Sequence, residues 1–171
     1  SFPTRRSSDL LDIYQKIEEG NQVRIGVTLC LKEFGDVYYE MGDFEKAIEY
    51  SNRVLDMNKK SGNNLGVANS LSTLGKIYYD AGEYQKASSY LKRSQALKDS
   101  LNDHTEMPSI LRYLGKIDLI NGNLSRAGKD LKNSLNFAIK QNLKEDVKEA
   151  YLALSELYEK TGNHSKALEY Y

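Results

Sequence analysis

The chain has 171 residues, of which 40% are apolar and 28% charged, a composition typical of one folded domain or a short repeat array. Its 24 basic and 24 acidic residues cancel to a net charge of zero, so no overall basic field attracts nucleic acid or an anionic membrane. No apolar run reaches the roughly 18–20 residues that span a bilayer. We therefore expect no nucleic acid and no membrane contact for this segment.

The first ten residues, SFPTRRSSDL, are unlike the rest of the chain. They are rich in serine and arginine and show no apolar periodicity. Residues 1–9 also resemble the in-frame translation of a widely used short-read sequencing adapter. We interpret 1–9 as a non-native prefix that packs poorly, with a native disordered linker as the alternative. Arg5 and Arg6 then carry no functional weight, and the lack of a signal peptide tells nothing about compartment.

From about residue 10 the sequence repeats with a period of 40 residues. An internal repeat of this length indicates a repeat architecture. One column of the repeat is glycine in every unit and another is alanine in every unit, while a third is glycine in three units and serine in the last. Chance does not align so many columns. The three columns are Gly42, Gly82, Gly122 and Gly162; Ala47, Ala87, Ala127 and Ala167; and Gly35, Gly75, Gly115 and Ser155.

The repeat divides the chain into units. Residues 10–20 continue the register backwards as a half repeat, and we predict further units at 22–61, 63–103, 105–142 and 144–171. The last unit is truncated and has no polar capping helix, so we expect the chain to be an internal piece of a longer protein.

Each unit predicts two helices. Val67, Leu71, Leu74 and Tyr78 are spaced by four, three and four residues, which places them on one helix face. The glycine column then ends the first helix, because a left-handed residue commonly follows a helix. Next in the chain come Asp43, Glu83, Asn123 and Asn163, of which all but the glutamate are favoured N-caps.

Two further positions refine this arrangement. Pro108 suits the first turn of a helix, where its missing N–H costs little. Gly75 and Ala87 are predicted to lie on facing helices of one hairpin, where small side chains let the two helices approach closely. No segment alternates with a period of two, so we predict an all-α fold.

The segment LSTLGKIYYDAGEYQKASSYL (71–91) resembles the tetratricopeptide repeat pattern of Leu-Gly, then Tyr, Gly and Ala. The family's usual unit has about 34 residues, and the 40-residue unit here is similar to arrays in bacterial signalling proteins. The resemblance implies an α-α superhelix, a right-handed solenoid of antiparallel hairpins with about nine helices.

Catalytic signatures are missing from the sequence: it has no phosphate-binding glycine loop, zinc-protease motif or nucleophile elbow. His104 and His164 occupy different repeat positions and have no neighbouring Cys or His, so we predict exposed turn residues rather than metal ligands. We therefore predict no enzyme, no catalytic residue, no metal and no small-molecule cofactor.

The resemblance implies that the first helix of each unit lines a concave groove. Lys76, Arg112 and Lys116 would form a basic ladder in it, beside Tyr39 and Tyr79, suited to an extended peptide with acidic groups. An ordinary solvated helix face is the alternative. The full predicted groove is Lys32, Asp36, Tyr39, Asn69, Ser72, Lys76, Tyr79, Arg112, Lys116 and Leu119.

The leading functional hypothesis is a non-catalytic scaffold that binds a peptide or protein segment in this groove. The alternative is a sensor or regulatory segment of a bacterial two-component histidine kinase or transcription regulator whose effector domain lies outside the fragment. A third and weaker idea is a protein cofactor for an enzyme whose catalytic domain lies outside the fragment. The sequence leaves the compartment open, with the cytoplasm favoured.

Overall fold

The computed structural model describes residues 21–171, with side chains from Ile25 onward. The predicted prefix 1–9 and half repeat 10–20 lie outside the described residues.

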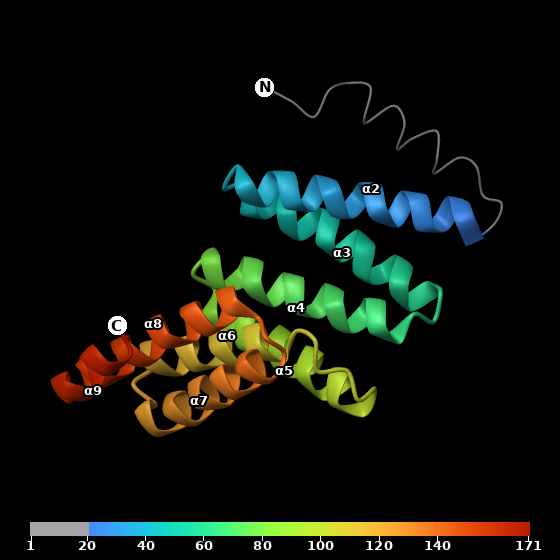
Figure 1. The fold of residues 1–171 in the computed structure, drawn as a ribbon. Coiled ribbons are helices and arrows are strands. Elements are labelled where there is room, and N and C mark those ends of the chain that lie inside the picture. The colour runs from blue at the N-terminus through green and yellow to red at the C-terminus, as the bar shows by residue number, and fades with distance from the viewer. Residues whose placement is uncertain (1–20) are drawn as a thin grey trace.

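Helices account for most of the described chain, and no strand occurs in residues 21–171. Consecutive helices pair as hairpins that stack side by side into a curved array (Figure 1). The predicted all-α superhelix is therefore confirmed. The helices are α2 (Asn21–Glu40), α3 (Phe44–Lys60), α4 (Asn64–Asp80), α5 (Tyr84–Ser100), α6 (Met107–Ile120), α7 (Leu124–Lys140), α8 (Lys144–Lys160) and α9 (His164–Glu169).

The glycine column ends the first helix of each unit, as predicted. Gly42, Gly82, Gly122 and Gly162 have φ of 75°, 78°, 75° and 72°, a left-handed conformation that glycine adopts without steric cost.

A second left-handed column, which the sequence did not predict, ends the other helix of each unit. Gly62, Asn102 and Asn142 have φ of 68°, 52° and 55°, and asparagine is among the few other residues that tolerate this region. The 40-residue unit is thus two halves of 20 residues, most of them a helix of 17 residues and a three-residue turn.

The predicted N-caps behave differently from one another. The carboxylate of Asp43 and the amide of Asn163 each accept a hydrogen bond, from the backbone N–H of Lys46 and Lys166 respectively. Glu83 and Asn123 make no capping bond, and the Asn123 amide instead donates to Asp118 Oδ1 at 3.1 Å. Pro108 lies in the first turn of α6, as predicted.

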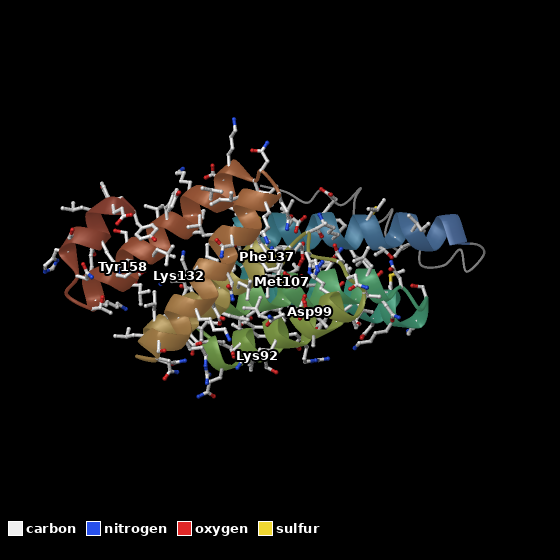
Figure 2. All side chains as sticks on the ribbon, turned by 60° about the horizontal axis from the view of Figure 1, so that its bottom comes forward. Lys92, Asp99, Met107, Lys132, Phe137 and Tyr158 are labelled. Carbon is white, nitrogen blue, oxygen red and sulfur yellow. The ribbon has the colours of Figure 1, made fainter. Side chains whose placement is uncertain are left out.

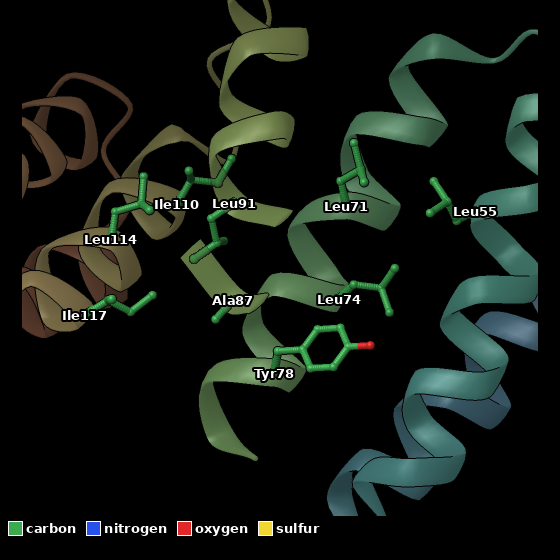
Figure 3. Packing of buried hydrophobic residues seen from close by; sticks show 9 residues of the cluster. All are labelled: Leu55, Leu71, Leu74, Tyr78, Ala87, Leu91, Ile110, Leu114 and Ile117. Carbon is green, nitrogen blue, oxygen red and sulfur yellow. The ribbon is translucent and has the colours of Figure 1, made fainter. Parts of the chain in front are cut away.

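The core lies between the hairpins. Figure 3 shows Leu55 of α3 facing Leu74 of α4, and Ile110 of α6 beside Leu91 of α5. A Cβ on Gly75 would lie 2.6 Å from Leu91 Cγ, and Ala87 is fully buried. The predicted close approach of α4 and α5 is therefore confirmed. Charged side chains lie on the outside of the second helices, where Lys92, Asp99 and Lys132 are exposed (Figure 2).

The junctions between hairpins use one repeat column with three kinds of residue: Asn58, Lys98 and Ala138, all buried. The Asn58 amide donates to Ser70 Oγ at 3.1 Å. Lys98 Nζ lies 2.7 Å from both Asn69 Oδ1 and Asp103 Oδ2. Asp103 belongs to the six-residue connector between α5 and α6, so the buried lysine holds this longer connector in place.

No helix within residues 21–171 combines the length and the apolar character needed to cross a membrane.

Candidate binding face

The ten predicted groove residues lie on the first helices α2, α4 and α6, and eight of them are at least partly exposed. For the other two residues, the prediction that they lie on the binding surface is wrong. Ser72 has no exposed area, and Leu119 is 3% exposed because it packs with Leu154 and Leu157 in an apolar cluster shared with α8. Close packing of α6 against α8 therefore removes one predicted position from the surface.

Arg112 is also less available than the sequence suggested. Its guanidinium lies 3.4 Å from Glu149 Oε2 and 3.8 Å from Asp146 Oδ1, both on α8, and its side chain is only 11% exposed. Two carboxylates thus neutralise the middle rung of the predicted basic ladder. Lys76 and Lys116 are partly exposed and form no ion pair within residues 21–171.

Three more predicted residues have partners inside the chain. Lys32 and Asp36 form an exposed ion pair of 2.9 Å with each other along α2. Asn69 accepts a hydrogen bond from the buried Lys98. The three residues still lie on the predicted face, but their charged or polar groups already have partners and are less available to a ligand.

Lys32, Asp36 and Asn69 all line a hollow of about 180 Å³ between α2, α3 and α4. It is smaller than the roughly 300–1,000 Å³ of pockets that enclose a small molecule, so its size suits a single side chain. The lining residues are Thr28, Leu29, Lys32, Asp36, Ser51, Val54, Asn58, Gly66, Asn69, Ser70 and Thr73.

The structure brings Tyr39, Tyr79, Asp80 and Tyr113 together; we call these four residues the tyrosine–aspartate cluster. Tyr39 Oη on α2 donates to Asp80 Oδ2 on α4 at 2.6 Å. The ring centroids of Tyr79 and Tyr113, on α4 and α6, are 5.0 Å apart with the ring planes at 74°. We call the first helix of each unit an inner helix. The cluster therefore links the inner helices α2, α4 and α6 near the C-terminal end of α4.

Burial keeps the cluster's hydroxyls protonated. Burial, followed by the hydrogen bond to Asp80, raises the pKa of Tyr39 well above its usual range. Burial and the neighbouring Tyr84 and Glu156 raise the pKa of Tyr79 to about 12. Burial and then the Asp80 carboxylate raise the pKa of Tyr113. Near neutral pH, the three phenols of the cluster are therefore neutral.

Sequence reasoning found Tyr39 and Tyr79 but missed Asp80, Tyr113 and Glu149. Asp80 directly follows a predicted groove residue, and Tyr113 follows Arg112, so the aromatic and acidic neighbours were the available signal. Their contacts depend on how α6 lies against α4 and α8, which spacing along one helix does not reveal.

Metal chemistry finds no support in the described part of the chain. Within residues 21–171 no group of three or more His, Cys, Asp or Glu side chains is placed to hold a metal ion. His104 is exposed and its ring lies 5.5 Å from that of Phe137, while His164 is exposed at the start of α9.

Three solved structures show the same fold as this chain. BtubC (BKLC) from P. vanneervenii has a TM-score of 0.78 at 20% identity, over 96% of this chain and 67% of that one. The STAND protein PH0952 from Pyrococcus horikoshii, which has a tetratricopeptide repeat sensor, has a TM-score of 0.77 at 23% identity, over 96% and 25%. A Rap protein complexed with Competence and Sporulation Factor has a TM-score of 0.77 at 18% identity, over 97% and 47%.

This chain thus spans a quarter of the STAND protein and about half of the Rap protein. No curated protein matches the sequence. Two family models, both described as tetratricopeptide repeat, match residues 25–100 and 148–171. Together with the helix hairpins, the left-handed glycine turns and the small residues between paired helices, these matches show that the chain belongs to the tetratricopeptide repeat family.

Proposed function

We propose that this chain is a non-catalytic interaction module that binds a peptide or protein segment along its inner helices. One observation carries the proposal: large apolar side chains are exposed at repeat positions equivalent to predicted groove residues. Leu29 and Leu152 are 56% and 44% exposed and stand 40 residues from the predicted groove residues Asn69 and Arg112. Ile120 is 44% exposed and stands 40 residues from Asp80 of the tyrosine–aspartate cluster. All three lie on the helices that come first in their units, as the predicted groove residues do, and exposed apolar area there is available to a partner.

Charge on the same face adds to this argument. Lys76 and Lys116 are partly exposed and make no ion pair within residues 21–171, so both remain available to a partner. Solenoid repeats commonly use the concave surface of the stack for binding. The Rap structure contains a bound factor, which supports a peptide or protein partner here by analogy of fold.

The test is a peptide-display selection against the immobilised full chain, followed by affinity measurements on the selected peptides. The double variant Leu29→Ser/Leu152→Ser should weaken their binding about tenfold, because each serine removes apolar contact area. Ile139→Ser is the matched control, since Ile139 is 54% exposed on the second-helix α7. Equal losses in both variants, or a selection without enriched peptides, would contradict the proposal.

A second candidate is a sensor or regulatory segment of a larger bacterial signalling protein. The 40-residue unit and the fold shared with the repeat sensor of PH0952 favour this candidate. The uninterrupted gene tests it: a kinase or DNA-binding domain in the same reading frame would support the role, and its absence would exclude it.

A further inference from the structure

The tyrosine–aspartate cluster contains a carboxylate without a cation. Asp80 is exposed and accepts a hydrogen bond from Tyr39 at 2.6 Å, but it forms no ion pair with any residue of 21–171. Three carboxylates of α8 do have cationic partners: Glu149 and Asp146 pair with Arg112, and Glu156 pairs with Lys160. The charge of Asp80 is therefore not compensated by an ion pair within residues 21–171.

The position of Asp80 is not explained by helix stability. It is the last residue of α4, where the helix dipole is negative and a carboxylate is disfavoured. An asparagine there could accept the same hydrogen bond from Tyr39 without this electrostatic cost. The negative charge itself is thus the property that local structure does not require.

The rings around Asp80 are arranged to attract a cation. Tyr79 is its immediate neighbour, and the perpendicular packing of Tyr79 on Tyr113 leaves both rings partly exposed. The face of a tyrosine ring carries negative charge density and binds ammonium or guanidinium groups. A carboxylate beside partly exposed rings therefore combines the two kinds of group that recognise a basic side chain.

Two cationic side chains, Arg112 and Lys76, lie near Asp80, and neither forms an ion pair with it. Arg112 lies over the Tyr113 ring at 5.1 Å, but its charge is engaged by the two carboxylates of α8. Lys76 is one helical turn before Asp80 on α4 and makes no ion pair with it. An incoming cation would compete with Lys76 for Asp80 and with Arg112 for the Tyr113 ring.

We propose that Tyr39, Tyr79, Asp80 and Tyr113 form a subsite for an arginine or lysine side chain of a bound polypeptide. The inference rests on the proposed function and specifies the chemistry of one contact: a basic residue of the partner beside Asp80. It differs from the acidic peptide that the predicted lysine and arginine ladder would select.

The test is an NMR titration of the ¹⁵N-labelled full chain at low salt with the blocked peptide Gly-Ser-Arg-Ser-Gly. Matched peptides carry citrulline, which keeps the shape of arginine without its charge, or glutamate at the central position. We expect the arginine peptide to shift the amide signals of Tyr39, Asp80 and Tyr113. The citrulline peptide should bind about tenfold more weakly, because it lacks the charge-assisted contact.

Variants separate the subsite from general charge effects. Asp80→Asn keeps the acceptor for Tyr39 and should weaken arginine-peptide binding about tenfold. Glu40→Gln removes the same charge from the equivalent repeat position on α2, where no hydrogen bond or ion pair with the cluster occurs among the described residues, and should leave affinity unchanged. Lys76→Ala should maintain or increase affinity, because it removes the competing cation.

The outcomes distinguish this inference from the general function. Equal binding of the arginine and citrulline peptides, unchanged affinity in Asp80→Asn, or the absence of arginine-dependent shifts in the cluster would overturn the subsite. If instead the glutamate peptide shifts signals near Lys76 and Lys116, the binding face stands and only the basic ligand is wrong. Binding of display-selected peptides that is insensitive to the inner-face leucines would contradict the general function separately.

Discussion

The first helix pair, α2 and α3, and the second, α4 and α5, have equivalent residues in the repeat. They differ in the space around the glycine at which their helices meet. In the second pair, a Cβ on Gly75 would lie 2.6 Å from Leu91 Cγ, whereas in the first pair the nearest atom to a Cβ on Gly35 is Ser51 Oγ, at 3.4 Å. The difference comes from the facing residue, a leucine in one pair and a serine in the other. A repeat column thus indicates where helices meet, and the residue opposite decides how closely.

The junctions that follow these two pairs differ in the same way. Between α3 and α4, the neutral Asn58 amide bonds to Ser70, and a hollow of about 180 Å³ remains. Between α5 and α6, the fully buried Lys98 is held by Asn69 and Asp103, with Glu106 at 3.7 Å. A buried ammonium needs several partners to offset its desolvation, whereas an amide needs fewer. The longer connector supplies those partners.

The largest expected effect comes from removing the buried charge. Lys98→Ala should lower the free energy of unfolding by about 3 kcal/mol, because it leaves a cavity and strands the partners of the ammonium. Asn58→Ala at the same repeat position should cost about 1 kcal/mol, since only a neutral hydrogen bond is lost. Urea denaturation measures both values. Equal losses would show that the two junctions do not differ in the way described.

The second prediction tests packing within the pairs. Gly75→Ala should destabilise the protein by about 1–3 kcal/mol, because the added methyl overlaps Leu91. Gly35→Ala should be neutral or stabilising by up to about 1 kcal/mol, because alanine favours the helix and space exists for its methyl. Thermal unfolding of the two variants provides the comparison, and a destabilising Gly35→Ala would contradict it.

A smaller effect should appear in acid. The hydrogen bond from Lys98 is the main reason that the pKa of Asp103 is lowered to about 2, below the ordinary aspartate value of about 3.9. A carboxyl whose pKa is depressed by folding stabilises the protein above the unfolded pKa, and this contribution is lost as protons bind. Stability should therefore fall between about pH 4 and pH 2.

Asp103→Asn is the control for this pH dependence. Denaturation curves measured at several pH values should show a shallower loss for the variant than for the parent chain over the same window, because other carboxyls titrate equally in both. Parallel curves would mean that Asp103 does not contribute. The junction at Asn58 provides the contrast, since its amide does not titrate.

The smallest effect is expected at the surface of the first pair. Lys32 and Asp36 form an ion pair of 2.9 Å, but both side chains are exposed. Lys32→Ala should change the free energy of unfolding by less than about 0.5 kcal/mol, because solvent screens such pairs. Urea denaturation in low and high salt checks this value. If Lys32→Ala lowered the free energy of unfolding nearly as much as Lys98→Ala, buried and exposed charges would not differ in the way described.

Much of the fold could be predicted from the 40-residue columns, because the positions that end helices and allow helices to approach require particular small residues. Gly82 had to be left-handed and Gly75 had to be small, and both predictions are confirmed. The binding face was less predictable. Arg112, Ser72 and Leu119 were predicted as surface residues on register alone, yet one is neutralised and two are buried.

The sequence by itself determined that the chain is a helical repeat, where its first helices end, and which helices carry the candidate face, since these depend on spacing along a single helix. Only the tertiary structure decided which residues of that face remain available. The partners of Arg112 lie on α8, and the hydrogen bond between Tyr39 and Asp80 joins α2 to α4. Such contacts depend on the stacking of successive hairpins, and the spacing of residues within one helix does not specify that geometry.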